Sequence, residues 1–432
     1  MSDDTPKAKL SILDKLKITD KKQQKPSIQK RKEQVFKPVE IEEEGSFELV
    51  ATCMQNLEEE LAEELRQIGA SNIEIQRRAV KFTADKELMY KANIWLRTAL
   101  KVLKPLFSFT AKDPDDLYKN AKKLEWEKVF SEEKTFSIDS AVFSESFTHS
   151  QFASLRVKDA IVDRFREQQI NRPNVERFQA DVRIHLHINK NDVTLSLDSS
   201  GDPLFKRGYR TQQHIAPINE CLAAGLILKS GWKGESDFLD PMCGTGTIAI
   251  EAALIACNIP PNMNRTHFAF EGWKSYDQVL LSKVLRDAKD EYKPLTNKIY
   301  ARELASNNIR SARVNINSAN MRKSITLEQA DFFKIDAPSA NGLMIMNPPY
   351  GERLSITEGL PDFYERIGSA LKHEYPGWTA WIIASEIESF KNIGLKTSQK
   401  IPMMNGKLEC QFRKYELFEG KREEEVIRRN KK

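Results

Sequence analysis

Long apolar runs are absent from this 432-residue chain. The longest, around residues 222–228 and 343–346, fall far short of the roughly 20 residues that span a bilayer. The first ten residues carry no apolar segment typical of a signal peptide, so we expect a cytoplasmic protein without a membrane span. The five cysteines are scattered and odd in number, and the six histidines do not cluster, which argues against a disulfide framework and a metal site.

A strong excess of one charge is also missing. The chain has 67 Lys and Arg against 62 Asp and Glu, a net charge of +5, so attraction to a polyanion has to come from local clusters. With 40% hydrophobic residues and only 18 Gly and 18 Pro, the composition excludes collagen-like and largely disordered proteins. The length predicts about three domains.

Both ends of the chain are charged. Residues 1–45 lack apolar periodicity, and 11 Lys and Arg lie between residues 7 and 37, against Asp14, Asp20 and Glu33. We expect a flexible basic arm here, which serves either as an electrostatic tether to RNA or as a solubilising leader. Residues 421–432 are expected to form a charged tail.

Residues 46–110 predict a small βαββα domain. A strand at residues 47–51 is followed by a helix at 57–68, which Gly69 ends, and by two short strands at 73–75 and 80–82. Apolar residues at helical spacing from Leu88 to Leu103 predict a second helix before Pro105. This order is typical of a ferredoxin-like domain.

Residues 111–200 predict a second α+β domain. A strand at 136–138 precedes a helix whose expected apolar face is Phe152, Leu155, Ile161 and Phe165, and alternation at 182–188 and 193–197 predicts a hairpin. The same helix carries Arg156, Lys158, Arg164 and Arg166. The outer face of the hairpin carries Arg183, His185 and His187, which either meet nucleic acid or form an ordinary solvated face.

After a linker at residues 201–215, residues 216–420 alternate between helices and apolar strands, the pattern of an α/β domain. We expect strands at 238–239, 299–300, 325–327, 343–346 and 378–383. Asn405 and Gly406 predict the turn of a final hairpin into 410–412 and 415–418.

A glycine loop follows the first of these strands and precedes a helix: Asp240-Pro241-Met242-Cys243-Gly244-Thr245-Gly246-Thr247. A strand, a glycine turn and a helix N-terminus together predict a nucleotide site. The loop lacks the lysine of a phosphate-binding P-loop. The next strand-end acid, Glu303, lies too far along the chain for a dinucleotide fingerprint, which disfavours NAD.

A second motif ends the strand at 343–346: Asn347-Pro348-Pro349-Tyr350-Gly351. Proline fixes φ and removes a donor, so the Asn347 amide oxygen and the Pro348 carbonyl can both accept protons from one exocyclic amine. Tyr350 offers a flat face on which an extruded base can stack. The motif therefore indicates methylation of an amino group on a base, and no cysteine that could act as a nucleophile lies nearby; Cys243 is a small packing residue of the glycine loop.

These two motifs resemble the cofactor loop and catalytic loop of class I S-adenosylmethionine-dependent amino-methyltransferases. Together with residues 204–210 and 216–220, they resemble the THUMP-containing RNA guanine-N2 methyltransferases, including the bacterial 23S rRNA enzymes of the L type; the resemblance covers residues 47–418. It implies a Rossmann-like class I methyltransferase domain behind α+β ferredoxin-like and THUMP domains, with S-adenosylmethionine as cofactor and 23S rRNA or a large-subunit precursor as partner.

The resemblance also implies roles for individual residues. Asp240 and the loop of Cys243, Gly244 and Gly246 would hold the methionine part of the cofactor. Glu303 would bind the ribose hydroxyls, Asp331 would contact the adenine amine, and Phe332 would either pack on that ring or belong to the core. Asn347, Pro348 and Tyr350 would form the target-base site.

Three basic residues of the linker, Lys206, Arg207 and Arg210, are expected to contact RNA phosphates or, alternatively, to form salt bridges between domains. Related enzymes can carry a second methyltransferase domain, and this chain is expected to perform one methylation. A tRNA guanine-N2 methyltransferase, an adenine-N6 methyltransferase and a non-catalytic RNA-binding or ribosome-assembly protein remain alternatives.

Overall fold

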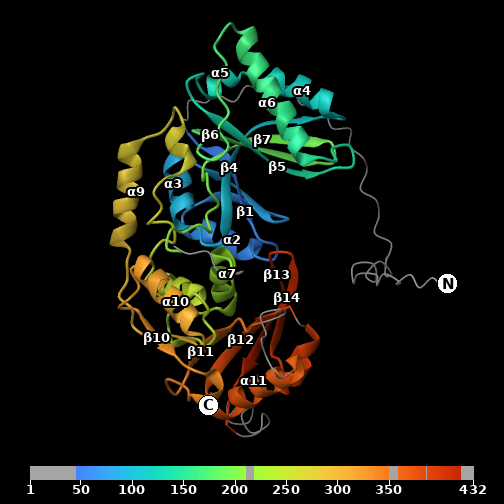
Figure 1. Ribbon diagram of the computed structural model, residues 1–432. Helices are drawn as coiled ribbons and strands as arrows, with labels where there is room; N and C mark the ends of the chain where they lie inside the picture. The colour runs from blue at the N-terminus through green and yellow to red at the C-terminus, as the bar shows by residue number, and fades with distance from the viewer. Residues whose placement is uncertain (1–44, 211–217, 350–358, 386, 420–432) are drawn as a thin grey trace, which may run out of the picture. The chain divides into compact units, whose positions relative to one another are not determined.

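The computed structural model describes residues 45–210, 218–349, 359–385 and 387–419. In this part of the chain the strands form two seven-stranded sheets (Figure 1). The elements of the first half are β1 (Phe47–Cys53), α2 (Glu58–Gln67), β2 (Ser71–Gln76), β3 (Ala79–Ala84), α3 (Lys86–Trp95), β4 (Ala99–Thr110), α4 (Pro114–Lys122), α5 (Trp126–Val129), β5 (Phe136–Phe143), α6 (Ser150–Glu167), β6 (Val182–Asn189) and β7 (Asp192–Asp198).

The predicted βαββα order is confirmed, but the second helix was predicted too long. It ends at Trp95, and Leu103 and Pro105 belong to the strand β4. The carboxylate of Glu64 accepts hydrogen bonds from the main-chain amides of Arg97 (2.7 Å) and Thr98 (3.0 Å), which fixes the turn between α3 and β4. Pro105 is tolerated within the strand because it lies at an irregularity in the pairing with β7.

Strand β4 joins the two N-terminal regions into one sheet. The strand order is β2-β3-β1-β4-β7-β6-β5, and β4 pairs with β1 on one side and with β7 on the other. The same strand therefore ends the ferredoxin-like region and begins the sheet of the second α+β region. Sequence periodicity alone predicted two separate units, because it cannot show which strands pair.

Helix α6 lies over the second part of this sheet, and its apolar face differs from the predicted one. Val157, Ile161 and Phe165 are buried against the sheet, whereas Phe152 and Leu155 are 51% and 44% exposed. The prediction was wrong for these two residues because the helical positions that face the sheet include small residues. Alanines at these positions let the helix approach the strands closely.

The second half of the chain forms a mostly parallel sheet with the strand order β10-β9-β8-β11-β12-β14-β13. Only β14 runs antiparallel to its neighbours β12 and β13. The elements are α7 (Glu220–Ser230), β8 (Phe238–Asp240), α8 (Thr247–Ala256), η1 (Ala269–Gly272), α9 (Gln278–Asp290), β9 (Ile299–Glu303), α10 (Ser306–Ser318), β10 (Ile325–Gln329), η2 (Phe332–Lys334), β11 (Gly342–Met346), α11 (Leu360–Glu374), β12 (Trp378–Ala384), η4 (Ile387–Ile393), β13 (Gln399–Asn405) and β14 (Leu408–Glu416).

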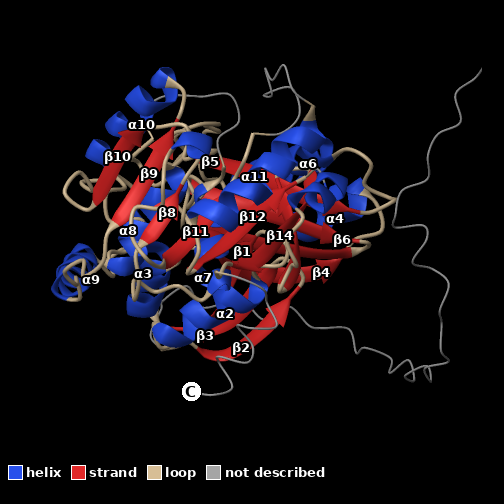
Figure 2. Cartoon of the chain, turned by 90° about the horizontal axis from the view of Figure 1, so that it is seen from below, coloured by secondary structure: helices blue, strands red, loops and turns tan. Residues whose placement is uncertain are grey.

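Helices cover both faces of this sheet (Figure 2). Leu343 and Ile345 of β11 pack in one core with α7, α8 and α10, while Met344 and Met346 pack in another with α11. Burial on both faces explains the continuous apolar runs that predicted these strands. The two segments expected at 410–412 and 415–418 lie largely in one strand, β14, after the predicted turn at Asn405.

The segment between α8 and β9 packs back on the N-terminal sheet region. Phe270 stacks on Tyr90 of α3, with ring centroids 4.4 Å apart, and the Tyr90 hydroxyl accepts a hydrogen bond from the amide of Asp277 at 3.0 Å. This contact links the two halves of the chain through buried aromatic surface. No described helix is both long and apolar enough to cross a membrane.

Candidate active site

The candidate site lies where strands β8, β9 and β11 end. β8 is paired with β9 on one side and β11 on the other, so Asp240, Glu303 and Asn347 come to the same edge of the sheet. After β8 the chain adds β9 and β10 on one side of it and then crosses to add β11 and β12 on the other side. Ligands of open α/β sheets bind at such a switch in strand order. Residues separated by more than 60 positions in the sequence are thereby brought together.

The glycine loop between β8 and α8 adopts the backbone that its glycines permit. Gly244 and Gly246 have φ angles of 54° and 82°, in the left-handed region, and the Gly246 amide donates to the Cys243 carbonyl at 2.8 Å. A Cβ added to Gly244 would meet no atom within 4 Å, whereas one on Gly246 would lie 3.4 Å from the Ala312 Cβ. The loop is therefore open at Gly244 and closed beneath Gly246.

Asp240 is fully buried, and within the described part of the chain neither of its carboxylate oxygens has a well-formed hydrogen bond. Burial and, after it, the charge of Glu303 raise the pKa of Asp240 well above its usual range. The main-chain amides of Ala249 and Met242 lower this pKa, but by less. These two amides do not compensate for the burial of the carboxylate, which is therefore unfavourable. The site therefore fits a ligand that brings a positive donor, such as the ammonium of a methionine moiety.

Glu303 connects the loop to helix α10. One carboxylate oxygen accepts the Gly244 amide at 2.9 Å and the other accepts the Ala305 amide at 2.8 Å. A carboxylate has about four acceptor positions, so two remain for further donors. This geometry is compatible with a carboxylate that accepts hydrogen bonds from two ribose hydroxyls.

Asp331 and Phe332 follow strand β10. The Asp331 carboxylate accepts the amide of Phe333 at 3.1 Å and pairs with Lys334 at 3.4 Å, so it caps the short helix η2. Phe332 is buried, and one face of its ring stacks on Tyr375 with centroids 5.4 Å apart. This packing agrees with the alternative that Phe332 belongs to the hydrophobic core.

Asn347 and Pro348 follow β11 directly. The Asn347 side-chain oxygen is buried and accepts no hydrogen bond within the described part of the chain, and Pro348 is buried as well. An unpaired buried amide oxygen is costly unless a ligand donor reaches it. Tyr350, the third residue of the expected target-base site, lies outside the described residues.

The linker residues differ in their surroundings. Lys206 is exposed and pairs with Asp202 at 3.4 Å. Arg207 is completely buried, lies 3.5 Å from the Glu251 carboxylate, and donates to the main-chain carbonyl of Arg97. The expected phosphate contact of Arg207 is therefore incompatible with its position, and the alternative of an interdomain salt bridge describes it.

Arg210 is also held by protein groups. Its Nη2 donates to the Thr247 hydroxyl at 3.0 Å and to the Ile218 carbonyl at 3.1 Å, and its Nε lies 3.0 Å from the Glu220 carboxylate. The guanidinium contacts the first turns of α7 and α8, and the side chain is 20% exposed. Its expected role as a phosphate contact has no support in this geometry.

An open groove of about 730 Å³ lies beside helix α6. Its lining includes the basic residues Arg156, Lys158, Arg166 and Arg172 as well as the acids Asp159 and Asp163.

On the hairpin face, burial, and then the nearby charge of Lys101, lower the pKa of His185 to about 4. The imidazole of His185 is thus neutral at pH 7, and the basic groove is a better candidate for phosphate contacts than the hairpin face.

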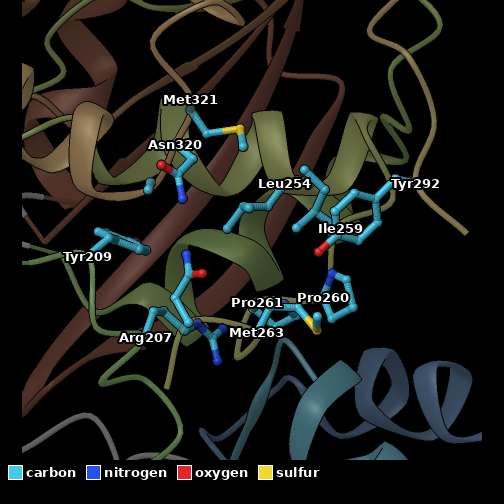
Figure 3. A pocket seen from close by; sticks show the side chains of 12 residues that line it. Arg207, Tyr209, Leu254, Ile259, Pro260, Pro261, Met263, Tyr292, Asn320 and Met321 are labelled. Atoms are coloured by element: carbon cyan, nitrogen blue, oxygen red, sulfur yellow. The ribbon is translucent and has the colours of Figure 1, made fainter. Parts of the chain in front are cut away.

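A second cavity, of about 90 Å³, is lined by residues of the linker and of helix α8, including Arg207, Tyr209 and Leu254 (Figure 3). None of the sheet-edge residues described above lines it, so we do not assign it to the candidate active site. Among the described residues, no group of three or more His, Cys, Asp or Glu side chains could hold a metal ion.

Two functional neighbours were missed by sequence reasoning. Asn315 of α10 donates a hydrogen bond to the carbonyl of Thr245 at 3.0 Å and so attaches the glycine loop to α10. Glu251 of α8 accepts the Tyr209 hydroxyl at 2.9 Å. A single acid in the apolar run of residues 248–256 was a signal for a buried partner, whereas nothing in the sequence distinguished Asn315.

Three family matches cover most of the described chain. Residues 48–103 match an RlmL ferredoxin-like domain, residues 111–198 a THUMP domain, and residues 207–414 an RMKL-like methyltransferase domain. The strand order, the open glycine loop and the polar residues at the strand ends agree with these matches. Fold and site thus define a class I methyltransferase domain preceded by ferredoxin-like and THUMP domains.

Similarity to whole proteins makes this assignment narrower. A protein of Synechocystis sp., slr0064, whose name describes it as an RNA methyltransferase, is 37% identical over 369 residues, 85% of this chain and 96% of its own length. The ribosomal RNA large subunit methyltransferase K/L of Shewanella pealeana is 36% identical over 84% of this chain. The crystal structure of SMU.472, described as a methyltransferase complexed with SAH, has a TM-score of 0.78 at 28% identity and covers 88% of this chain and all of its own. The chain belongs to the family of THUMP-containing, S-adenosylmethionine-dependent RNA methyltransferases.

The chain spans about half the length of the K/L relatives, since the match covers 52% of the Shewanella pealeana protein.

Proposed function

We propose that this protein transfers a methyl group from S-adenosylmethionine to the exocyclic N2 of a guanosine in 23S rRNA. The observation that carries the proposal is the buried side-chain oxygen of Asn347, which has no hydrogen-bond partner among the described residues and directly follows β11, the neighbour of the strand that leads into the glycine loop. An acceptor at this place is complementary to the amine of a base. The K/L name of the relatives favours large-subunit rRNA as the substrate.

The cofactor, when bound, supplies a methyl group that is activated by the positive charge on its sulfur. We assign Asp240 and the loop amides to its methionine part, Glu303 to its ribose and Asp331 to its adenine. Because the carboxylate oxygens of Glu303 already accept the amides of Gly244 and Ala305, its orientation is fixed before any ligand arrives. The residues thus provide a preorganised site.

The target amine is oriented by two acceptors, the side-chain oxygen of Asn347 and the main-chain carbonyl of Pro348. Each accepts one N–H of the guanosine amine, which directs the nitrogen lone pair along the line of transfer. As the new N–C bond forms and the S–C bond breaks, the amine releases one proton to water, since an amide oxygen does not titrate near pH 7. Stacking on Tyr350 is predicted to hold the extruded base.

The THUMP region is assigned to holding the RNA, with the basic groove beside α6 as the surface for phosphates. Arg156 and Arg166 of this groove are each paired with an acid in the free protein, at 2.7 Å and 3.2 Å from Asp115 and Asp163. Phosphates would compete for these guanidinium groups, so RNA affinity should fall steeply with salt. Since its substrate is ribosomal RNA, we place the protein in the cytoplasm.

The test is transfer of labelled methyl groups from S-adenosylmethionine to undermethylated large-subunit rRNA, small-subunit rRNA and tRNA, followed by identification of the labelled nucleoside. N2-methylguanosine in large-subunit rRNA alone supports the proposal. Label in tRNA or in adenosine would replace the substrate and retain the enzyme class. Absence of label with every RNA would favour the non-catalytic alternative, and the Asn347→Ala variant serves as the background control.

A further inference from the structure

Linker residues 207–210 lie against helix α8, which begins directly after the glycine loop. Figure 3 shows Arg207 and Tyr209 of the linker at the same cavity as Leu254 of α8. Tyr209 and Arg207 both approach Glu251, the first as a donor at 2.9 Å and the second as an ion pair at 3.5 Å. The linker therefore contacts α8 through buried polar groups.

Arg210 contacts α8 one turn closer to the glycine loop. Its Nη2 donates to the hydroxyl of Thr247, the first residue of α8, at 3.0 Å. Thr247 and Glu251 are four residues apart and therefore lie on the same face of the helix. The linker thus holds one face of α8 at two successive turns.

The position of Thr247 determines where the glycine loop can lie. Gly246 precedes it with a φ of 82°, so the chain reverses immediately before the helix begins. Asn315 holds the Thr245 carbonyl at 3.0 Å and Glu303 holds the Gly244 amide at 2.9 Å. Arg210 supplies the third attachment, on the helical side of the loop.

The remaining contacts of Arg210 keep it in place. Its Nε lies 3.0 Å from the carboxylate of Glu220, a residue that is only 4% exposed, and its Nη2 also donates to the Ile218 carbonyl at 3.1 Å. The guanidinium thus joins α7 to α8. A planar, forked donor can make these contacts together, whereas a lysine ammonium acts as a single point charge.

We propose that Arg210 is a positioning residue for cofactor binding, which acts through the Thr247 hydroxyl to hold the glycine loop in its binding conformation. This inference rests on the proposed function, because it takes S-adenosylmethionine as the ligand of that loop. It assigns to Arg210 a role in cofactor affinity and none in contact with RNA phosphates.

The test is calorimetric titration of S-adenosylhomocysteine into the full-length protein and its variants. Arg210→Lys keeps the positive charge beside Glu220 and loses the forked contact, and Thr247→Val removes the hydroxyl at nearly constant volume. Each should weaken S-adenosylhomocysteine binding by about tenfold, the effect of one hydrogen bond to a charged group. Thr247→Ser, which retains the hydroxyl, should restore most of the affinity.

The double variant Arg210→Lys/Thr247→Val distinguishes positioning from general damage. If Arg210 acts through Thr247, the double variant should bind no more than about twofold more weakly than either single variant, whereas independent effects would multiply to about 100-fold. In steady-state kinetics the KM for S-adenosylmethionine should rise while kcat stays within twofold. The exposed linker cation Lys206 provides the matched control, since Lys206→Ala should leave S-adenosylhomocysteine affinity unchanged.

Two results would overturn the inference. One is unchanged S-adenosylhomocysteine affinity in folded Arg210→Lys and Thr247→Val proteins, with folding checked by thermal unfolding without ligand. The other is a loss of RNA affinity in Arg210→Gln, which removes the positive charge, with a salt slope reduced by about one, the behaviour of a phosphate contact. Failure of the unmodified protein to bind S-adenosylhomocysteine would instead overturn the proposed function itself.

Discussion

Replacement of Asn347 by alanine separates catalysis from stability. The side-chain oxygen of Asn347 is buried and accepts no hydrogen bond from the residues that the structure describes. If this oxygen accepts a proton of the target amine, its removal affects only the step in which the amine is oriented. We therefore expect Asn347→Ala to lose methyl transfer while it keeps its fold and its cofactor affinity.

The magnitudes follow from the same geometry. Loss of one preorganised hydrogen-bonding group in a transition state lowers kcat by about 100- to 1000-fold. Removal of a buried acceptor without a donor relieves about 1–3 kcal/mol of unfavourable desolvation, which offsets or exceeds the free energy lost with the packing of the side chain. The midpoint of thermal unfolding should accordingly stay the same or rise by a few degrees.

Asn93 is the matched control for this substitution. Asn93 is a fully buried asparagine that donates to the Met89 carbonyl at 3.0 Å and the Ser199 hydroxyl at 2.9 Å, and accepts from the Ser200 hydroxyl at 2.7 Å. Asn93→Ala should therefore lower the free energy of unfolding by about 2 kcal/mol or more, because buried partners are left unpaired.

The assay combines single-turnover methyl transfer, calorimetric titration of S-adenosylhomocysteine and thermal unfolding. An Asn347→Ala protein that transfers methyl groups within tenfold of the unmodified rate, and unfolds several degrees lower, would refute the reasoning, since Asn347 would then be structural. A large loss of S-adenosylhomocysteine affinity would equally refute it, since the residue would belong to the cofactor site.

Three further substitutions test other parts of the structure. Gly246→Val should destabilise the protein by about 1–3 kcal/mol and strongly weaken S-adenosylhomocysteine binding, because a β-branched residue resists the φ of 82°; normal binding would show that the loop tolerates other conformations. Arg207→Ala should lower the free energy of unfolding by about 3–5 kcal/mol, measured with urea, because it removes the cation beside the buried carboxylate of Glu251 and leaves the neutral Tyr209 hydroxyl as its donor; a stable variant with weaker RNA binding would restore the phosphate role. His185, whose pKa burial lowers to about 4, takes up its proton more readily in the unfolded chain, where the pKa is about 6.5, so stability should fall by about 2 kcal/mol between pH 7 and pH 5. His185→Gln should remove that part of the pH dependence in urea titrations, and an unchanged difference between the two pH values would exclude His185 as its source.

Local patterns predicted most elements, since the spacing of apolar residues and the residues that end a helix or strand can be recognised within a short segment. The strand at β1, the helix α2 and the hairpin β6–β7 follow from alternation, helical spacing and turn residues, and the structure confirms them. The prediction was wrong where a residue distant in the sequence determines the end of an element. Helix α3 ends before Leu103 because the carboxylate of Glu64 holds the following turn.

The candidate site was predictable only in part. The glycine loop and the Asn-Pro-Pro sequence stand out because each places a polar turn directly after an apolar strand. For Arg207 the sequence left a phosphate contact and an interdomain salt bridge as alternatives, and the packing of the linker on α8, which buries Arg207 against Glu251, favours the salt bridge. Asn315 gave no signal, because its contact with Thr245 depends on how α10 lies across the loop.

The sequence by itself determined the order of the domains and predicted a nucleotide loop and an amine as the reacting group, since these depend on residue types within short segments. The tertiary structure alone decided that β4 joins two regions in one sheet, that Asp240, Glu303 and Asn347 share one edge, and that the linker clamps α8. Strand pairing and burial bring together residues far apart in the chain, and no local pattern records which distant groups will meet.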